Sequence, residues 1–262
     1  MLTTKYILLI LGCFVLTNVI AQPKQYTTAN AHSHNDYEQS KPFVSAYTEQ
    51  FGSIEADIFS VPGSDVLLVG HELAQVQTNP RTLDSLYLIP IDNALKKYKG
   101  FPYADASRHL QLMIDIKTGA EETLAKLINS LKKYPAIIRN NNVHIVISGN
   151  RPPVNNLHIY PPYIKFDGNL TELYAEQQLK YIGMISSSFG TYSKWNGKGE
   201  FPDTDRNRLQ ADIDRAHAAG KKVRLWAIPD LPASWNLMKQ LGGDYINTDK
   251  ITQLAGYLKQ SQ

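Results

Sequence analysis

The stretch 31–72 gathers the residue types that acid–base and metal chemistry require. Glu55 and Asp57 alternate within a short apolar run, and His34 and His71 each follow such a run. Side chains of a strand repeat with a period of two, so Glu55 and Asp57 would project from one face. Two neighbouring carboxylates repel each other and lose hydration together unless a cation or a proton relieves them. The spacing therefore predicts a divalent metal with histidines beside it for proton transfer.

Oxygen donors make up the expected ligand set. Asn35, Glu55, Asp57 and Asp115 all lie at or near the ends of the first three predicted strands. Hard oxygen ligands without cysteine favour Ca²⁺ or Mg²⁺ over Zn²⁺. Any one acid could instead form an ion pair, as Asp115 could with Lys117. Three acids and an asparagine together favour one divalent cation, either Ca²⁺ or Mg²⁺.

Histidine titrates near neutral pH, which suits a general acid or base. His34 and His71 are the candidates for this pair. His32 lies two residues from His34, so on a strand it would share that face as a ligand or a partner. We assign structural hydrogen bonds to the remaining histidines, which are His109, His144, His158 and His217.

A phosphate ester would suit such a site, because a divalent ion can neutralise charge that develops on a phosphoryl oxygen. Lys117 and Arg151 could hold the remaining oxygens, Arg151 through a bidentate fork. Both could equally be solvated surface charges. Trp226 and Tyr37 could line the pocket or serve only in packing.

The elements that must position these residues alternate between strand-like and helix-like segments. Helices are expected within 82–97, interrupted at Pro90, over 207–219, and from about Lys250. Eight apolar strand-like segments, with polar residues where each one ends, predict a (β/α)₈ barrel whose catalytic face is the rim of strand ends. A doubly wound sheet is the alternative, but no glycine-rich phosphate loop follows the first strand. The predicted strands are 29–34, 53–59 with 66–70 as its extension, 110–117, 143–148, 163–167, 181–186, 222–228 and 244–247.

Composition sets the remaining bounds. Residues 1–21 resemble an export signal with cleavage near Ala21, and a lipoprotein signal at Cys13 is the weaker interpretation. We therefore expect an exported protein, periplasmic or extracellular, with no transmembrane span in the mature chain. Residues 22–262 suit one barrel domain without disulfides. A formal net charge of +3 gives no support for nucleic-acid binding.

The motifs HSHNDY, IEADIF, LLVGHE, RTLDSLYL and DYINTD resemble the phospholipase C-like phosphodiesterase superfamily, and in particular a bacterial and fungal branch of it. That superfamily includes glycerophosphodiester phosphodiesterases and phosphoinositide-specific phospholipases C on α/β barrels. The resemblance implies that His34 and His71 form the acid/base pair. It also implies that Glu55 and Asp57 bind metal, with Asn35 and Asp115 completing the site. Glycerophosphodiesterases usually have His-Arg where this chain has His34-Asn35, and asparagine there is similar to the calcium-dependent phospholipases C.

The chain is thus expected to be a metal-dependent phosphoric diester hydrolase, or a lyase that forms a cyclic phosphate. The substrate would resemble a glycerophosphodiester or a phospholipid headgroup, bound partly by His32, Lys117, Arg151 and Trp226. Two other classes stay open, namely an amidohydrolase or polymerase-type metallohydrolase and a non-catalytic ligand-binding barrel. The first of these needs further histidines at later strand ends, where Asp167 and Ser186 stand instead.

Overall fold

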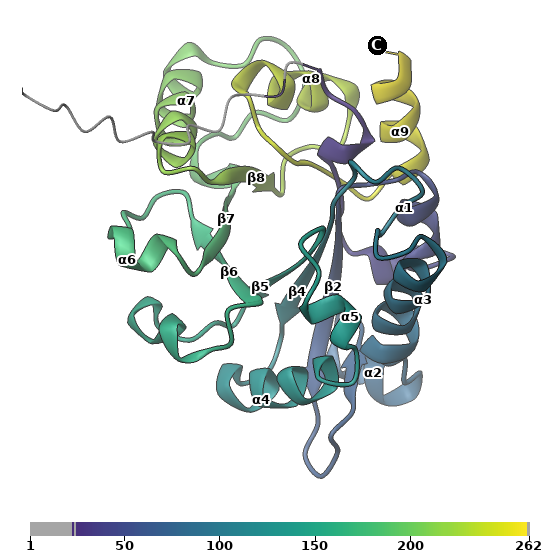
Figure 1. Cartoon of the computed structure of the whole chain (residues 1–262). Coiled ribbons are helices and arrows are strands. Elements are labelled where there is room, and N and C mark those ends of the chain that lie inside the picture. The colour runs from purple at the N-terminus through teal and green to yellow at the C-terminus, as the bar shows by residue number, and fades with distance from the viewer. Residues whose placement is uncertain (1–22, 24, 261–262) are drawn as a thin grey trace, which may run out of the picture.

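Eight parallel strands form a nearly closed barrel in the computed structural model, which describes residues 23 and 25–260 (Figure 1). Neighbouring strands pair in the order β8-β7-β6-β5-β4-β2-β1-β9. Between β8 and β9 a single parallel bridge, Arg224 to Tyr245, brings the two ends of the sheet together. The predicted α/β barrel is confirmed. Its strands are β1 Ala31–Ser33, β2 Ser53–Ser60, β4 Leu110–Ile116, β5 Val143–Gly149, β6 Ile164–Asn169, β7 Ile182–Ser188, β8 Lys222–Trp226 and β9 Ile246–Thr248.

One further strand, β3 (Leu67–Val69), folds back antiparallel on β2, as the predicted extension over 66–70 implies. Val69 pairs with Ile58, and the Gly70 N–H donates to the Asp57 carbonyl at 3.2 Å. Because β3 folds back along β2, His71 lies beside the part of β2 that carries Asp57.

Helices surround the strands on the outside of the barrel (Figure 1). The apolar face of α4 buries Leu124, Leu127 and Leu131 at helical spacing. The long helices are α3 Ile89–Lys97, α4 Ala120–Leu131, α7 Asp203–Ala218, α8 Pro232–Leu241 and α9 Ile251–Gln260. The shorter helical segments are η1 Thr28–Asn30, η2 Asp36–Glu38, α1 Val44–Thr48, α2 Leu73–Thr78, η3 Asp84–Leu88, α5 Pro135–Ile138, η4 Val154–Ile159, α6 Glu176–Leu179 and η5 Phe189–Thr191.

The expected interruption at Pro90 is wrong. A π-helical turn over Asp84–Leu88 runs directly into α3, and Pro90 stands in the first turn of that helix. The π-helical turn accommodates the proline, which has no N–H to donate to the carbonyl four residues earlier. The wider turn is closed by the Ile89 N–H, which donates to the Asp84 carbonyl.

Side chains inside the barrel change from apolar to polar along the strands. Met113, Val146, Met184 and Tyr245 form a small buried cluster of their own, apart from the larger core between strands and helices. Two residues further along three of those strands stand Asp115, Ser148 and Ser186. Because side chains two apart share a face, the barrel interior becomes polar at the carboxyl ends of its strands. Among the described residues, no helix is both long and apolar enough to cross a bilayer.

Candidate active site

A hollow of about 270 Å³ opens at the carboxyl ends of the strands. Most of the residues singled out from the sequence line it. The lining residues come from strands β2, β4, β5 and β8 and from the loops that follow β1, β3 and β4. The lining residues are His34, Asn35, Glu55, His71, Asp115, Lys117, Ser148, Arg224 and Trp226. The strand register therefore brings together residues that are up to 192 positions apart in sequence.

The loop after β1 is held from beneath by Asp36. This fully buried carboxylate accepts hydrogen bonds from Ser33 Oγ at 2.8 Å, Tyr87 Oη at 3.0 Å and the Phe43 N–H at 2.5 Å. Asn35, the preceding residue, has a left-handed backbone (φ 45°), which asparagine tolerates better than most residues. The HSHNDY motif therefore combines site residues with a structural aspartate, and Tyr87 of RTLDSLYL supports it.

Three carboxylates converge at the hollow, which Glu55 and Asp115 line and beside which Asp57 is buried. One ligand oxygen from each of Glu55, Asp57 and Asp115 lies within 4.8 Å of the other two. Lys117 Nζ contacts two of them, at 2.8 Å from Asp57 Oδ2 and 3.1 Å from Asp115 Oδ1. Burial and the Glu55 charge raise the pKa of Asp57 to about 6, in spite of Lys117 and Tyr37. Burial also raises the pKa of Asp115.

These acids fit a cation in addition to the lysine. Asp57 Oδ1 is buried and has no hydrogen-bond partner among the described residues. A buried carboxylate oxygen without a partner is costly, and a divalent cation would satisfy it. The donor set consists of carboxylate and amide oxygens, which suit Ca²⁺ or Mg²⁺.

His34 lies at one side of the hollow, with Nδ1 at 2.8 Å from Asp249 Oδ1. Burial lowers the pKa of His34, but the hydrogen bond to Asp249 and the charges of Glu55 and Asp249 raise it overall. Asp249 is in turn held by its own N–H, which donates to Asp230 Oδ2 at 2.9 Å. Because a carboxylate accepts the Nδ1 proton, Nε2 is the nitrogen of His34 that can exchange a proton.

His71 is more exposed and contacts the acids through Tyr37. Its Nδ1 lies 3.1 Å from Tyr37 Oη and 3.7 Å from Asp57 Oδ2. The same hydroxyl lies 2.6 Å from Asp57 Oδ2 and 2.8 Å from Asn35 Oδ1. Burial, followed by the Asp57 charge, raises the pKa of Tyr37 well above its usual value, so Tyr37 remains a neutral hydroxyl. Tyr37 therefore ties His71, Asn35 and Asp57 into one network.

His32 does not face the hollow; it is fully buried beneath Glu55. Its Nδ1 lies 2.8 Å from Ser53 Oγ and its Nε2 lies 2.7 Å from Glu55 Oε2. Burial and the nearby Arg224 lower the pKa of His32 to about 4, so the imidazole is neutral at pH 7. His32 therefore lies where it can orient Glu55 by a hydrogen bond.

Arg224 is a site residue that the sequence interpretation missed. This arginine is 3% exposed and donates from Nη1 to Glu55 Oε2 at 2.8 Å. Burial would raise the pKa of Glu55, but Arg224 and His32 lower it overall. Glu55 is therefore kept ionised. The signal available in the sequence is the spacing of two from Trp226, which places both residues on one face of β8.

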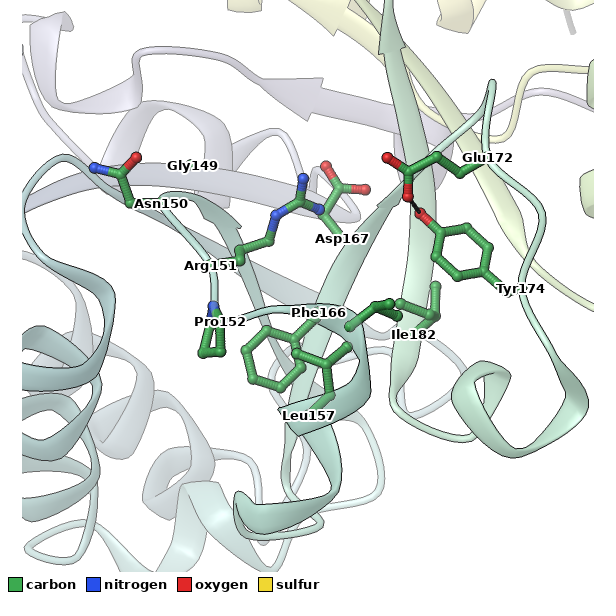
Figure 2. Close-up of a pocket in the computed structure, with 11 residues that line it drawn as sticks. Gly149, Asn150, Arg151, Pro152, Leu157, Phe166, Asp167, Glu172, Tyr174 and Ile182 are labelled. Atoms are coloured by element: carbon green, nitrogen blue, oxygen red, sulfur yellow. Dashed lines mark hydrogen bonds between the residues drawn. The ribbon is translucent and has the colours of Figure 1, made fainter.

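The other predicted residues are placed differently. Trp226 lines the hollow with 42% of its surface exposed. Arg151 lies in a separate hollow of about 510 Å³, which Gly149 and Asp167 also line (Figure 2). The histidines assigned to structural roles contact residues elsewhere. His109 stacks on His144, His158 Nδ1 lies 2.8 Å from the Asn155 carbonyl, and His217 pairs with Asp244.

The comparison with known families agrees with the phosphodiesterase class that the sequence motifs implied. Residues 22–144 match the model of the AIM6-like phosphodiesterase domain. Two fungal relatives are similar to this chain, one named Altered inheritance of mitochondria protein 6 and the other named as its homolog. The Kluyveromyces lactis protein is 26% identical over 87% of this chain and 72% of its own length. The Arthroderma benhamiae protein is 29% identical over 86% and 82%.

A solved structure shares the fold. A glycerophosphodiester phosphodiesterase from Parabacteroides distasonis superposes with a TM-score of 0.58 at 12% identity, covering 88% of this chain and 97% of its own. The structural likeness supports the barrel, and the family match confirms the class of enzyme.

The expected export of the chain is contradicted. The curated relatives are named for inheritance of mitochondria, and none of those names describes a secreted protein. The apolar segment interpreted as a signal, residues 1–21 with Cys13 and Ala21, lies outside the described residues. An apolar amino-terminal run is therefore not sufficient to assign a periplasmic or extracellular location here.

Proposed function

We propose that the chain is a phosphoric diester hydrolase that depends on one divalent cation, Ca²⁺ or Mg²⁺. The observation that carries this proposal is the convergence of Glu55, Asp57 and Asp115 within 4.8 Å, at the hollow that His34 and His71 line. Three acids held this close repel one another, and Lys117 and Arg224 together supply only two positive charges against three carboxylates.

Glu55, Asp57 and Asp115 would hold the cation, with Asn35 as a neutral oxygen donor. When bound, the ion would neutralise charge on a non-bridging phosphoryl oxygen. Lys117 Nζ contacts Asp57 Oδ2 at 2.8 Å, and Asp57 is one of the carboxylates that would bind the ion. With the ion on Asp57, Lys117 would turn from that carboxylate towards a phosphate oxygen.

The two histidines would exchange protons with the substrate. In both, Nδ1 is engaged, by Asp249 in His34 and by Tyr37 in His71, so Nε2 is the atom that takes or gives a proton. One histidine accepts a proton from the nucleophile as the new P–O bond forms. The other donates a proton to the alcohol oxygen as the old P–O bond breaks.

The nucleophile is water in a hydrolase, or a neighbouring substrate hydroxyl in a lyase that forms a cyclic phosphate. Either reaction needs the same pair of proton transfers. We propose a glycerophosphodiester or a phospholipid headgroup as the substrate class. The solved neighbour is a glycerophosphodiester phosphodiesterase, which supports this class by fold only. We also propose that residues 22–262 form a single domain. We further propose that the chain does not bind nucleic acid.

The test is a panel of phosphodiesters and phosphomonoesters assayed with Ca²⁺, with Mg²⁺ and with chelator. We expect diester turnover that needs one of the two metals and is abolished by chelator. Turnover that survives exhaustive chelation, or that requires zinc or manganese, would contradict the proposal.

A further inference from the structure

A third hollow, of about 340 Å³, lies at the amino-terminal ends of β5 and β6. Its lining residues belong to α5, to the loop between α5 and β5, and to the chain around the starts of β5 and β6. The carboxylate cluster and both candidate catalytic histidines lie at the opposite, carboxyl ends of the strands. This amino-terminal hollow is therefore separate from the candidate active site.

The polar side of the amino-terminal hollow is positively charged. Arg139, His144 and Lys165 line it together with two asparagines, and none of the lining residues is acidic. In the part of the chain that the structure describes, none of these three side chains forms an ion pair. Lys165 Nζ donates to the Lys180 carbonyl at 2.9 Å, which leaves two of its three N–H donors. The amino-terminal hollow therefore carries donors and positive charge that the protein itself does not neutralise.

A pair of histidines extends this positive side. The rings of His144 and His109 stack with centroids 5.6 Å apart, and neither ring makes a hydrogen bond within residues 25–260. Burial, followed by the charges of His109 and Lys222, lowers the pKa of His144 to about 4. The part of this shift that comes from charge indicates a positive potential at the ring. A metal ion at the imidazole pair would be repelled by that potential, whereas an anion would be attracted.

The remaining lining of the amino-terminal hollow is apolar. Ile138 and Tyr163 are partly buried, and Pro162 is exposed. An inorganic anion would leave these side chains in contact with water, whereas an apolar group attached to the anion would cover them and gain free energy in proportion to the area. The volume falls within the range of small-molecule sites, about 300–1,000 Å³. The amino-terminal hollow therefore suits a ligand that combines one anionic group with an apolar part.

We propose that the amino-terminal hollow binds an amphiphilic anion, in which a phosphate, sulfate or carboxylate group is attached to an apolar chain or ring. Arg139, His144 and Lys165 donate hydrogen bonds to the oxyanion, and Ile138 and Tyr163 pack against the apolar part. This site is separate from the proposed phosphodiesterase centre and does not depend on it.

Isothermal titration calorimetry of the full, chelator-treated chain tests this site with octyl phosphate below its micellar concentration. Chelator removes metal, so the phosphate group cannot bind through an ion at the carboxylate cluster. We expect one octyl phosphate per chain and no binding of octyltrimethylammonium, which has the same chain and the opposite charge. Inorganic phosphate should bind at least about tenfold more weakly, since covering about two CH₂ groups is sufficient for that ratio.

Two variants remove donors from the amino-terminal hollow. Arg139→Met and His144→Ala should each weaken the binding of octyl phosphate by at least about threefold. Arg139 is exposed and makes no side-chain hydrogen bond in the described structure, so Arg139→Met should fold as wild type does. Lys198→Met is the matched control, because this exposed lysine follows β7 at the other end of the barrel. Its affinity should equal that of wild type.

Four results would overturn the inference. They are no binding of octyl phosphate in wild type, equal binding of octyltrimethylammonium, inorganic phosphate bound as tightly as octyl phosphate, and equal affinities in Arg139→Met and Lys198→Met. Binding to vesicles that contain phosphatidic acid, without binding of monomeric octyl phosphate, would assign the cations to a lipid surface and would also contradict a ligand in the amino-terminal hollow.

NMR of the histidine rings locates the bound ligand. Octyl phosphate should shift the ring resonances of His144 and His109 and leave those of His34 unchanged, because His34 lies at the carboxyl ends of the strands. Unchanged His144 resonances at saturating octyl phosphate would place the ligand elsewhere and overturn the inference.

Discussion

Replacing Gly149 with alanine tests how closely the backbone after β5 approaches the carboxylate cluster. The new Cβ would lie 2.2 Å from Asp115 Oδ1 and 2.6 Å from the Ile116 carbonyl oxygen, where ordinary contact begins at 3.4 Å. The Ile116 oxygen belongs to a buried strand and cannot retreat, so Asp115 must move by about 1 Å. Gly149 also has φ +67°, a conformation that costs an L-residue about 1–2 kcal/mol.

The two effects have different magnitudes and can be separated. Overpacking adds about 1–3 kcal/mol, so Gly149→Ala should lose about 2–5 kcal/mol of unfolding free energy. Gly199 has the same φ of +67° with nothing within 4 Å of its added Cβ. Gly199→Ala should therefore lose only the backbone share, about 1–2 kcal/mol.

Urea denaturation of both variants, together with phosphodiesterase activity titrated against Ca²⁺ or Mg²⁺, gives the measurement. Gly149→Ala should need at least about tenfold more metal for half-maximal activity, because a displaced Asp115 is a weaker ligand. Gly199→Ala should match wild type in that titration. Equal stability losses in the two variants, with an unchanged metal requirement in Gly149→Ala, would refute this account of the Gly149–Asp115 contact.

Three further predictions follow from the site. His71→Ala should lower kcat by at least about a hundredfold, because it removes a general acid or base. Its melting temperature should stay close to wild type, since the side chain is 57% exposed. A fully active variant would remove His71 from the mechanism. Arg224→Met should lower the free energy of unfolding by about 3–5 kcal/mol, because it leaves the buried Glu55 without its guanidinium partner. Urea denaturation with chelator present gives the measurement, and a loss under about 1 kcal/mol would contradict that pairing. Burial raises the folded-state pKa of Asp167 to about 6, above about 3.9 in the unfolded chain, so this residue contributes stability at low pH that is lost as pH rises through 6. The melting temperature of Asp167→Asn relative to wild type should thus increase between pH 5 and pH 8, and a constant difference would count against this titration.

Alternation along strands made the carboxylate cluster predictable. Glu55 and Asp57 share a face of β2 as their spacing requires, and the strand ends bring Asp115 to them. His34 and His71 could be placed beside the acids because each follows a short strand, and β3 turns back on β2 as expected. These inferences need only the period of two and the direction of parallel strands.

Other contacts depend on barrel closure, which a linear sequence does not specify. Arg224 reaches Glu55 across the barrel interior, and Asp249 reaches His34 only because β9 pairs with β1. Arg151 follows β5, and its part in phosphate binding stays a prediction. Because β5 and β6 separate beyond Ile147, the side chain lies in the hollow that Gly149 and Asp167 line. Strand separation of this kind depends on register and loop packing, neither of which leaves a period in the sequence.

Isothermal titration calorimetry of the chelator-treated protein with Ca²⁺ and with Mg²⁺ tests the carboxylate cluster most directly. The geometry of Glu55, Asp57 and Asp115 predicts one ion per chain in wild type and no measurable binding in Asp57→Asn, which lacks the carboxylate whose Oδ1 has no other partner. No heat of binding with either ion in wild type, or equal binding in the variant, would contradict the proposed metal site.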